Sequence, residues 1–194
     1  MKEVDKMDNK SIRMITQNVK ALNPHVFLPS SFREEEPKYR ARFLISKKDE
    51  VTVKRIKSAM QEVYKNNENL FKDTGAVTPI ELLKLPLHDG DKEKGGDANY
   101  ANTYFINASS KYAPEIVKKI NGQIIKITDE DEIYSGVICK ASLNFFAYNV
   151  NGNKGIACSL GNIMKVKDGE RISTRISAAD DFANLDDDDF DFSF

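Results

Sequence analysis

The sequence has very few residues of the kinds that bind metals or form cross-links. Among 194 residues it has two cysteines, Cys139 and Cys158, and two histidines, His25 and His88. The cysteines have no CxxC spacing and no neighbouring histidine pair, so we expect them to be small buried residues in a reducing cytoplasm. Zinc chemistry has no support, and we expect no metal and no cofactor.

Long apolar runs and enzyme signature motifs are also missing. No apolar run approaches the roughly 20 residues of a membrane-spanning helix. The first ten residues, MKEVDKMDNK, are polar and charged, which is not typical of a secretory signal. Walker A, GxSxG and HExxH motifs are absent, so NTPase and hydrolase activities lack support. We expect a cytoplasmic protein that is not an enzyme.

Charge is unevenly distributed along the chain. The segment from Asp180 to Phe194 holds seven aspartates and no Lys or Arg, and without them 29 basic residues face 23 acidic ones, a net charge of about +6. A basic body favours a polyanionic partner. Two other interpretations stay open, namely a tail that only increases solubility and a DNA-mimicking interaction protein whose tail blocks a basic partner.

The apolar pattern predicts a mainly β chain with one inserted helix. Strands are expected over residues 11–19, 38–46, 103–109, 123–127, 134–150 and 156–166. A helix is expected over 51–65 with Asp49 as its N-cap, and a short one over 78–84. Prolines indicate a loop over 21–32, and turns are expected at Asn121-Gly122 and 151–155. Because repeated crossover helices are absent, antiparallel pairing in a small barrel or bent sheet is favoured.

The chain is long enough for one domain. We expect a flexible N-terminus over residues 1–10, one folded domain over 11–179 with a helical insertion near 50–100, and a disordered acidic tail over 180–194.

Alternation along three strands separates core residues from outward residues. From Val137 to Ala147 the odd positions, such as Leu143 and Phe145, are all apolar and predict a core face. The even positions include Phe146 and Tyr148 beside Lys140 and Asn144. These two rings either are covered by the inserted helix or the loop between residues 70 and 102, or they have a function.

The other two strands favour a function. Sorting KYRARFLIS and TYFINAS in the same way leaves cations, an amide and a ring facing outward. Rings beside cations are typical of single-stranded nucleic acid binding, since bases stack on rings and cations contact phosphates. The predicted contact residues are Lys38, Arg40, Arg42, Phe105, Asn107, Lys111, Lys140, Asn144, Phe146, Tyr148 and Lys154. Arg40 and Arg42 have an alternative role, which is to pair with Glu34 to Glu36.

The stretch LPLHDGDKE is the basis of a competing enzyme hypothesis. Its side chains His88, Asp89, Asp91 and Glu93 are of the type that holds Mg²⁺ or Mn²⁺ in a nuclease. The glycines at 90, 95 and 96 suit a solvated turn better, and the domain shows no further acidic cluster with a lysine base.

Several stretches resemble a known family. EPKYRARFLISKKD, LPLHDGD, YFINASSKYAP and the long motif from Tyr134 to Gly169 are similar to the single-stranded DNA-binding proteins of tailed bacteriophages, which are distantly similar to the T7-type proteins. The likeness extends from about Ser11 to Phe182. It implies an OB-fold, a five-stranded bent antiparallel barrel, and non-specific binding of single-stranded DNA in phage DNA replication, recombination and repair. It also implies a location in the host cytoplasm.

The acidic tail carries regularly placed rings. Replicative single-stranded DNA-binding proteins are similar in ending with an acidic segment and an aromatic residue that binds polymerase, primase or helicase. A tethered polyanion also competes with DNA for a cationic groove. A homodimer is left open. The predicted partner-binding residues are Asp186, Asp187, Asp188, Asp189, Phe190, Asp191, Phe192 and Phe194.

Overall fold

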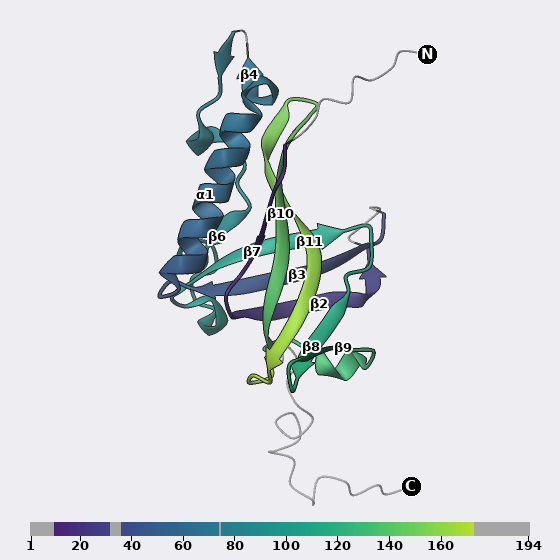
Figure 1. The fold of residues 1–194 in the computed structure, drawn as a ribbon. Coiled ribbons are helices and arrows are strands. Elements are labelled where there is room, and N and C mark those ends of the chain that lie inside the picture. The colour runs from purple at the N-terminus through teal and green to yellow at the C-terminus, as the bar shows by residue number, and fades with distance from the viewer. Residues whose placement is uncertain (1–9, 32–35, 74, 173–194) are drawn as a thin grey trace, which may run out of the picture.

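The computed structural model describes residues 10–31, 36–73 and 75–172 of the protein. The predicted flexible N-terminus, apart from Lys10, and the predicted acidic tail lie outside these residues. The described part is mainly β, as predicted, with one long helix (Figure 1). The strands are β1 (Ile12–Ile15), β2 (Val19–Ser30), β3 (Lys38–Ser46), β4 (Lys72–Asp73), β5 (Ala76–Val77), β6 (Leu87–Asp89), β7 (Thr103–Ser110), β8 (Ile116–Ile120), β9 (Gln123–Lys126), β10 (Ile138–Val150) and β11 (Asn153–Lys167).

The predicted helix is α1 (Glu50–Asn66), and its N-cap is Asp49 as expected. The Asp49 Oδ1 atom accepts a hydrogen bond of 3.0 Å from the Thr52 backbone N–H, which satisfies one of the unpaired donors of the first turn. The other helices are α2 (Gly90–Glu93) and the 3₁₀ turns η1 (Glu68–Phe71), η2 (Ile80–Leu82), η3 (Ala98–Tyr100) and η4 (Glu130–Glu132). The described part of the chain contains no helix that is long and apolar enough to cross a membrane.

Five strands form a ring, so the predicted fold class is confirmed. The order is β2-β3-β7-β11-β10, and β10 returns to β2 where Ile138 pairs with Lys20. The expected antiparallel pairing is wrong at two strand pairs. In the ring, β7 and β11 run parallel where Ser109 meets Ser159; outside it, β8 runs parallel to β11. Strand directions cannot alternate all the way around a ring with an odd number of strands, so at least one pair must be parallel. The pairing of β10 with β2 is short, at Ile138–Lys20 and Cys139–Val19. Strands β1 and β6 and the β8–β9 hairpin extend the sheet beyond the ring.

The predicted proline-rich loop over residues 21–32 is instead largely part of the twelve-residue strand β2. Its pairing with β3 is irregular between Leu22 and His25 and again between His25 and Ser30. Pro24 and Pro29 lie within these two irregular stretches, where a missing backbone N–H is tolerated. The strand predicted over 11–19 is correspondingly two elements, with β1 ending at Ile15 and β2 beginning at Val19.

The inward residues of the ring share one core. Phe145 of β10 and Phe43 of β3 are both fully buried, and Ile56 and Val63 of α1 pack into the same cluster. The odd residues of β10 from Cys139 to Ala147 are all buried, as alternation predicted. The two hairpins turn where expected, at Asn121-Gly122 and at Asn151-Gly152, with positive φ at all four residues.

Candidate nucleic-acid interface

The outward residues predicted as one surface lie on two sides of the barrel. Strands β10 and β11 cross over β7, β3 and β2 (Figure 1). Phe145 of the first layer and Phe43 of the second face the same core, so the outer sides of the two layers face away from each other. One group lies on or beside β3 and β7 and consists of Lys38, Arg40, Arg42, Phe105, Asn107 and Lys111. The other, the hairpin group, lies on β10 and β11 and consists of Lys140, Asn144, Phe146, Tyr148 and Lys154.

A groove of about 620 Å³ follows the outer side of β2, β3 and β7. Strand register places His25 beside Arg40 and Arg40 beside Ser109, and likewise Arg42 beside Asn107. The described lining residues include two arginines and a histidine and no carboxylate; they are Leu22, Asn23, His25, Ser30, Ser31, Arg40, Ala41, Arg42, Asn107, Ala108 and Ser109. A groove with cations, hydroxyls and amides and no acid suits a phosphate backbone.

Arg42 is held in a defined orientation in this groove. Its Nε donates a hydrogen bond of 2.7 Å to Asn107 Oδ1, and a terminal nitrogen donates to the Tyr100 hydroxyl. Its guanidinium carbon lies 5.1 Å from the centre of the Phe105 ring. A side chain whose rotamer is already restricted loses less entropy when it binds a ligand. Glu36 is paired with Lys111, and Glu34 and Glu35 lie outside the described residues.

The prediction that Phe105 is an exposed ring is wrong. Phe105 points to the outer side of β7 as expected, but it is only 2% exposed. It belongs to a second, small apolar cluster with Leu22, Leu44 and Tyr100, and the His88 ring stacks on it at 4.8 Å. Tyr100 arrives from η3, a turn that strand alternation does not detect. Phe105 therefore supports Arg42 and offers no open face to a base.

At one end of β7 the structure contains an exposed ring that the sequence argument missed. Tyr112 is 84% exposed, and its backbone N–H donates a hydrogen bond of 2.9 Å to Ser110 Oγ. It lies three residues beyond Ser109 of the groove and directly follows Lys111. Tyr112 is in a loop, so alternation along β7 does not apply to it. His25 also lines the groove but was not among the predicted contact residues. The prolines had indicated a loop over residues 21–32, so His25 was not assigned to a strand.

In the hairpin group, the predicted contact residue Lys154 is held against another segment of the protein. Its side chain is 8% exposed, its Nζ lies 2.5 Å from Asp73 Oδ1, and it donates to the Lys72 carbonyl oxygen at 3.0 Å. The Lys154 ammonium keeps the pKa of the Asp73 carboxyl below its usual range. Lys154 thus ties the hairpin to the segment after α1.

Phe146 and Tyr148 are half-buried on the outer side of β10, and part of the covering alternative is correct. Asn149 Nδ2 donates to the Leu70 carbonyl oxygen at 2.9 Å, so the segment after α1 contacts the hairpin tip. Lys84 pairs with Gly155, where a Cβ atom would clash with the Lys84 carbonyl oxygen and the Tyr148 hydroxyl. Only glycine fits this approach.

In the stretch LPLHDGDKE, two aspartates pair with Lys47. Lys47 Nζ lies 2.7 Å from Asp89 Oδ1 and 2.7 Å from Asp91 Oδ2, while His88 Nδ1 lies 3.0 Å from Glu93. Within the described ranges no group of three or more His, Cys, Asp or Glu residues is arranged to hold a metal ion. Lys47 therefore neutralises two of the three carboxylates on which the nuclease hypothesis depends.

Replacing Lys47 with methionine should lower the stability of the fold at neutral pH, by an amount that decreases as pH falls. Hydrogen bonds from Lys47 lower the pKa of both Asp89 and Asp91, and groups with a lowered folded-state pKa stabilise the fold above their unfolded-state pKa, about 4. The wild type should therefore melt at a higher temperature than Lys47→Met at pH 7. The difference should shrink as pH falls through the folded-state values.

Thermal melts of Lys47→Met and of Lys48→Met, the exposed neighbour, measured between pH 7 and pH 2.5 would check this expectation. A difference that stays constant over the whole pH range would assign the effect to packing of the Lys47 stem.

One family profile matches most of the chain, and two solved structures share its fold. A family profile described as "Enterobacter phage Enc34, ssDNA-binding protein" matches residues 12–192. The structure is similar to the single-stranded DNA-binding protein from bacteriophage Enc34 in complex with ssDNA, with a TM-score of 0.67, 22% identity, and coverage of 83% of this chain and 89% of that one. It is also similar to gp2.5, the single-stranded DNA-binding protein encoded by bacteriophage T7, with a TM-score of 0.57, 15% identity, and coverage of 85% and 97%. No curated protein sequence gives a significant match.

Proposed function

Because this chain belongs to the family of the Enterobacter phage Enc34 ssDNA-binding protein, we propose that it binds single-stranded DNA without sequence specificity in the groove on β2, β3 and β7. The observation that carries the proposal is the composition of this groove, whose described lining has two arginines and a histidine and no carboxylate. Phosphates would contact Arg40 and Arg42, and bases would stack on exposed rings such as Tyr112.

We do not include the hairpin group in the proposed DNA-binding surface. Lys154 and Asn149 hold the tip of the β10–β11 hairpin against the segment after α1, and Phe146 lies on the side away from the groove. The proposed contact residues are therefore Lys38, Arg40, Arg42, Asn107, Lys111 and Tyr112, with Phe105 behind Arg42.

In the cell, the protein would coat and protect single strands in the host cytoplasm during phage DNA replication, recombination and repair. This role is non-enzymatic, as the family description implies. Titration of poly-dT at several salt concentrations tests it, since binding to a phosphate backbone must weaken linearly in log–log terms as salt rises. No binding to poly-dT, or cleavage of labelled strands with Mg²⁺, would contradict the proposal.

The acidic tail would dock polymerase, primase or helicase and would occupy the groove when DNA is absent. Support comes from Ile172, the last described residue, whose backbone N–H donates to the Ser135 carbonyl oxygen at 2.8 Å. Ile172 packs on the cluster of Leu22 and Phe105, and Leu22 also lines the groove. The described chain therefore ends beside the groove, and a short tether from Ile172 would give the acidic tail a high effective concentration there.

Truncation after Ala179 should strengthen binding to single-stranded DNA, and most at low salt. Removing seven aspartates removes a competitor whose attraction to the groove is screened as ionic strength increases. We expect the truncated protein to bind dT oligonucleotides at least severalfold more tightly at about 50 mM salt, where the Debye length is above about 10 Å. The two affinities should converge at high salt. Equal affinities at all salt concentrations would contradict competition by the tail, without affecting the groove itself.

A further inference from the structure

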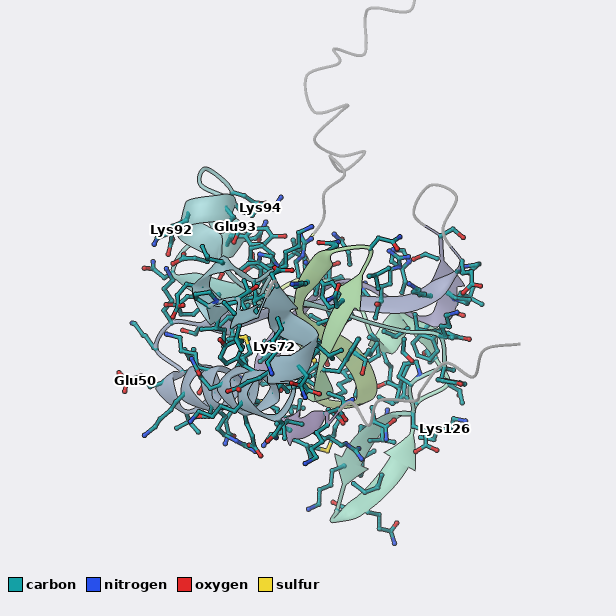
Figure 2. All side chains as sticks on the ribbon, turned by 90° about the horizontal axis from the view of Figure 1, so that it is seen from above. Glu50, Lys72, Lys92, Glu93, Lys94 and Lys126 are labelled. Atoms are coloured by element: carbon teal, nitrogen blue, oxygen red, sulfur yellow. The ribbon has the colours of Figure 1, made fainter. Side chains whose placement is uncertain are left out.

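A second hollow, of about 710 Å³, lies along the exposed side of α1. Its apolar residues are Val53 and Tyr104, and its lysines are Lys47, Lys54, Lys57 and Lys65. The DNA-binding site proposed above uses none of these side chains. Two glutamates, Glu50 and Glu62, also line the hollow, and Glu50 lies at one end of α1 in Figure 2.

The hollow combines an aromatic ring with exposed positive charge. Lys47 and Lys57 lie over the Tyr104 ring, with their Nζ atoms 4.9 Å and 5.7 Å from its centre. Lys47 is committed to Asp89 and Asp91. Lys54, Lys57 and Lys65 are exposed and provide the charge that a ligand would meet. A ligand that fits has an aromatic side chain flanked by carboxylates.

The end of this chain has that chemistry. Residues 186–194, DDDDFDFSF, hold five aspartates and three phenylalanines, and Phe194 adds the terminal carboxylate. We propose that the α1 hollow of one copy binds residues 186–194 of a neighbouring copy, with a phenylalanine ring against Val53 and Tyr104 and the carboxylates at the lysines. This rests on the proposed function, because copies that coat one DNA strand lie side by side.

The neighbouring copy is favoured over the same chain by the position of Ile172, the last described residue. Ile172 packs against the cluster that contains Phe105, on the outer side of β7, whereas Tyr104 points to the inner side, beside Ile45 of the core. A tail that reached its own hollow would have to pass around its own sheet. Thirteen residues lie between Ile172 and Asp186, and this stretch spans up to about 50 Å when extended, which is enough to reach an adjacent copy.

The hollow gives DNA binding a cooperative consequence. In DNA-free protein the tail occupies the groove, and DNA displaces it. The displaced tail then docks on α1 of the next copy, so each bound copy helps to hold its neighbour on the strand. The same acidic segment thereby binds the groove when DNA is absent and the α1 hollow of a neighbouring copy when DNA is bound.

The test is the binding of a fluorescent peptide of residues 180–194 to full-length protein, measured by anisotropy. The protein is first saturated with the shortest dT oligonucleotide that fills one copy, so that the groove is occupied and no neighbour is present. Lys57→Glu is compared with Arg55→Glu, an exposed residue of α1 outside the hollow, and the peptide is compared with its Phe194→Ala form.

We expect wild type and Arg55→Glu to bind the peptide equally, and Lys57→Glu and the Phe194→Ala peptide to show at least tenfold weaker binding. Lys57→Glu should also lose cooperativity on long poly-dT while its affinity for the short oligonucleotide is unchanged. If the oligonucleotide displaces the peptide from wild type, the groove is the tail's only site and the proposal is wrong. Equal peptide binding by Lys57→Glu also overturns it. Failure of the proposed function would show separately, as absence of oligonucleotide binding.

Discussion

Reversing both groove arginines, Arg40→Glu with Arg42→Glu, should lower the affinity for single-stranded DNA by about 100-fold or more. Each arginine removed costs a charge-assisted hydrogen bond of about 1.5–3 kcal/mol, and about 1.4 kcal/mol is a factor of ten. The introduced carboxylates repel phosphates in addition. The salt dependence should change as well, because each lost phosphate contact lowers the log–log slope by about 0.7 for a single strand. A slope smaller by about 1.4 is the specific sign that two contacts were lost.

The matched control is Lys119→Glu with Lys126→Glu, which changes the net charge by the same amount. Both lysines are exposed on the β8–β9 hairpin, and Figure 2 shows Lys126 far from α1 and α2. This pair should reduce affinity only slightly and leave the slope nearly unchanged. If the two double variants weaken binding equally, net charge and not the groove determines affinity. Arg42→Lys adds a finer comparison, since it keeps the charge but loses the planar fork that bonds Asn107.

Strand alternation predicted which residues point inward, because that property is local. Side chains of a strand alternate between two faces, and only one face of each strand can reach the core. Phe145 and Phe43 were placed correctly for this reason. The α1 N-cap at Asp49 and the turn at Asn121-Gly122 were also predictable, because they depend on backbone chemistry within a few residues.

Alternation did not predict how outward faces are arranged around a closed barrel. Arg42 and Phe146 both point away from the core, yet from opposite layers, and no pattern within either strand contains that information. The same limit explains Phe105, which Tyr100 covers from a turn, and Lys154, which is held by Asp73 from a segment about eighty residues earlier. Lys47 neutralises Asp89 and Asp91 across forty residues. Contacts from outside the strand itself decided each case.

Phe145→Ala should be the most destabilising single substitution at the β10–β11 hairpin, while Phe146→Ala should have a small effect. Phe145 is fully buried in the main core, and removing such a ring costs about 3–5 kcal/mol through lost burial and the cavity left behind. That is a large part of a typical folding free energy of about 5–15 kcal/mol. Phe146 is half-buried on the other face, so its loss should cost about 1 kcal/mol, the central value for point substitutions.

The two variants distinguish an effect on packing from an effect on DNA binding. Urea unfolding and affinity for short dT oligonucleotides are measured on both Phe145→Ala and Phe146→Ala. With unchanged m-values, the midpoints report stability directly. Equal destabilisation would mean that the outer side of β10 is covered as fully as the core. A Phe146→Ala variant with near-normal stability but weaker binding would place this ring in the DNA path. The strand would then have to contact both layers of the barrel, and the groove on β2, β3 and β7 would be only part of the site. We expect neither result, because Phe146 lies on the side of the barrel away from Arg42 and Lys154 holds the hairpin tip to the segment after α1.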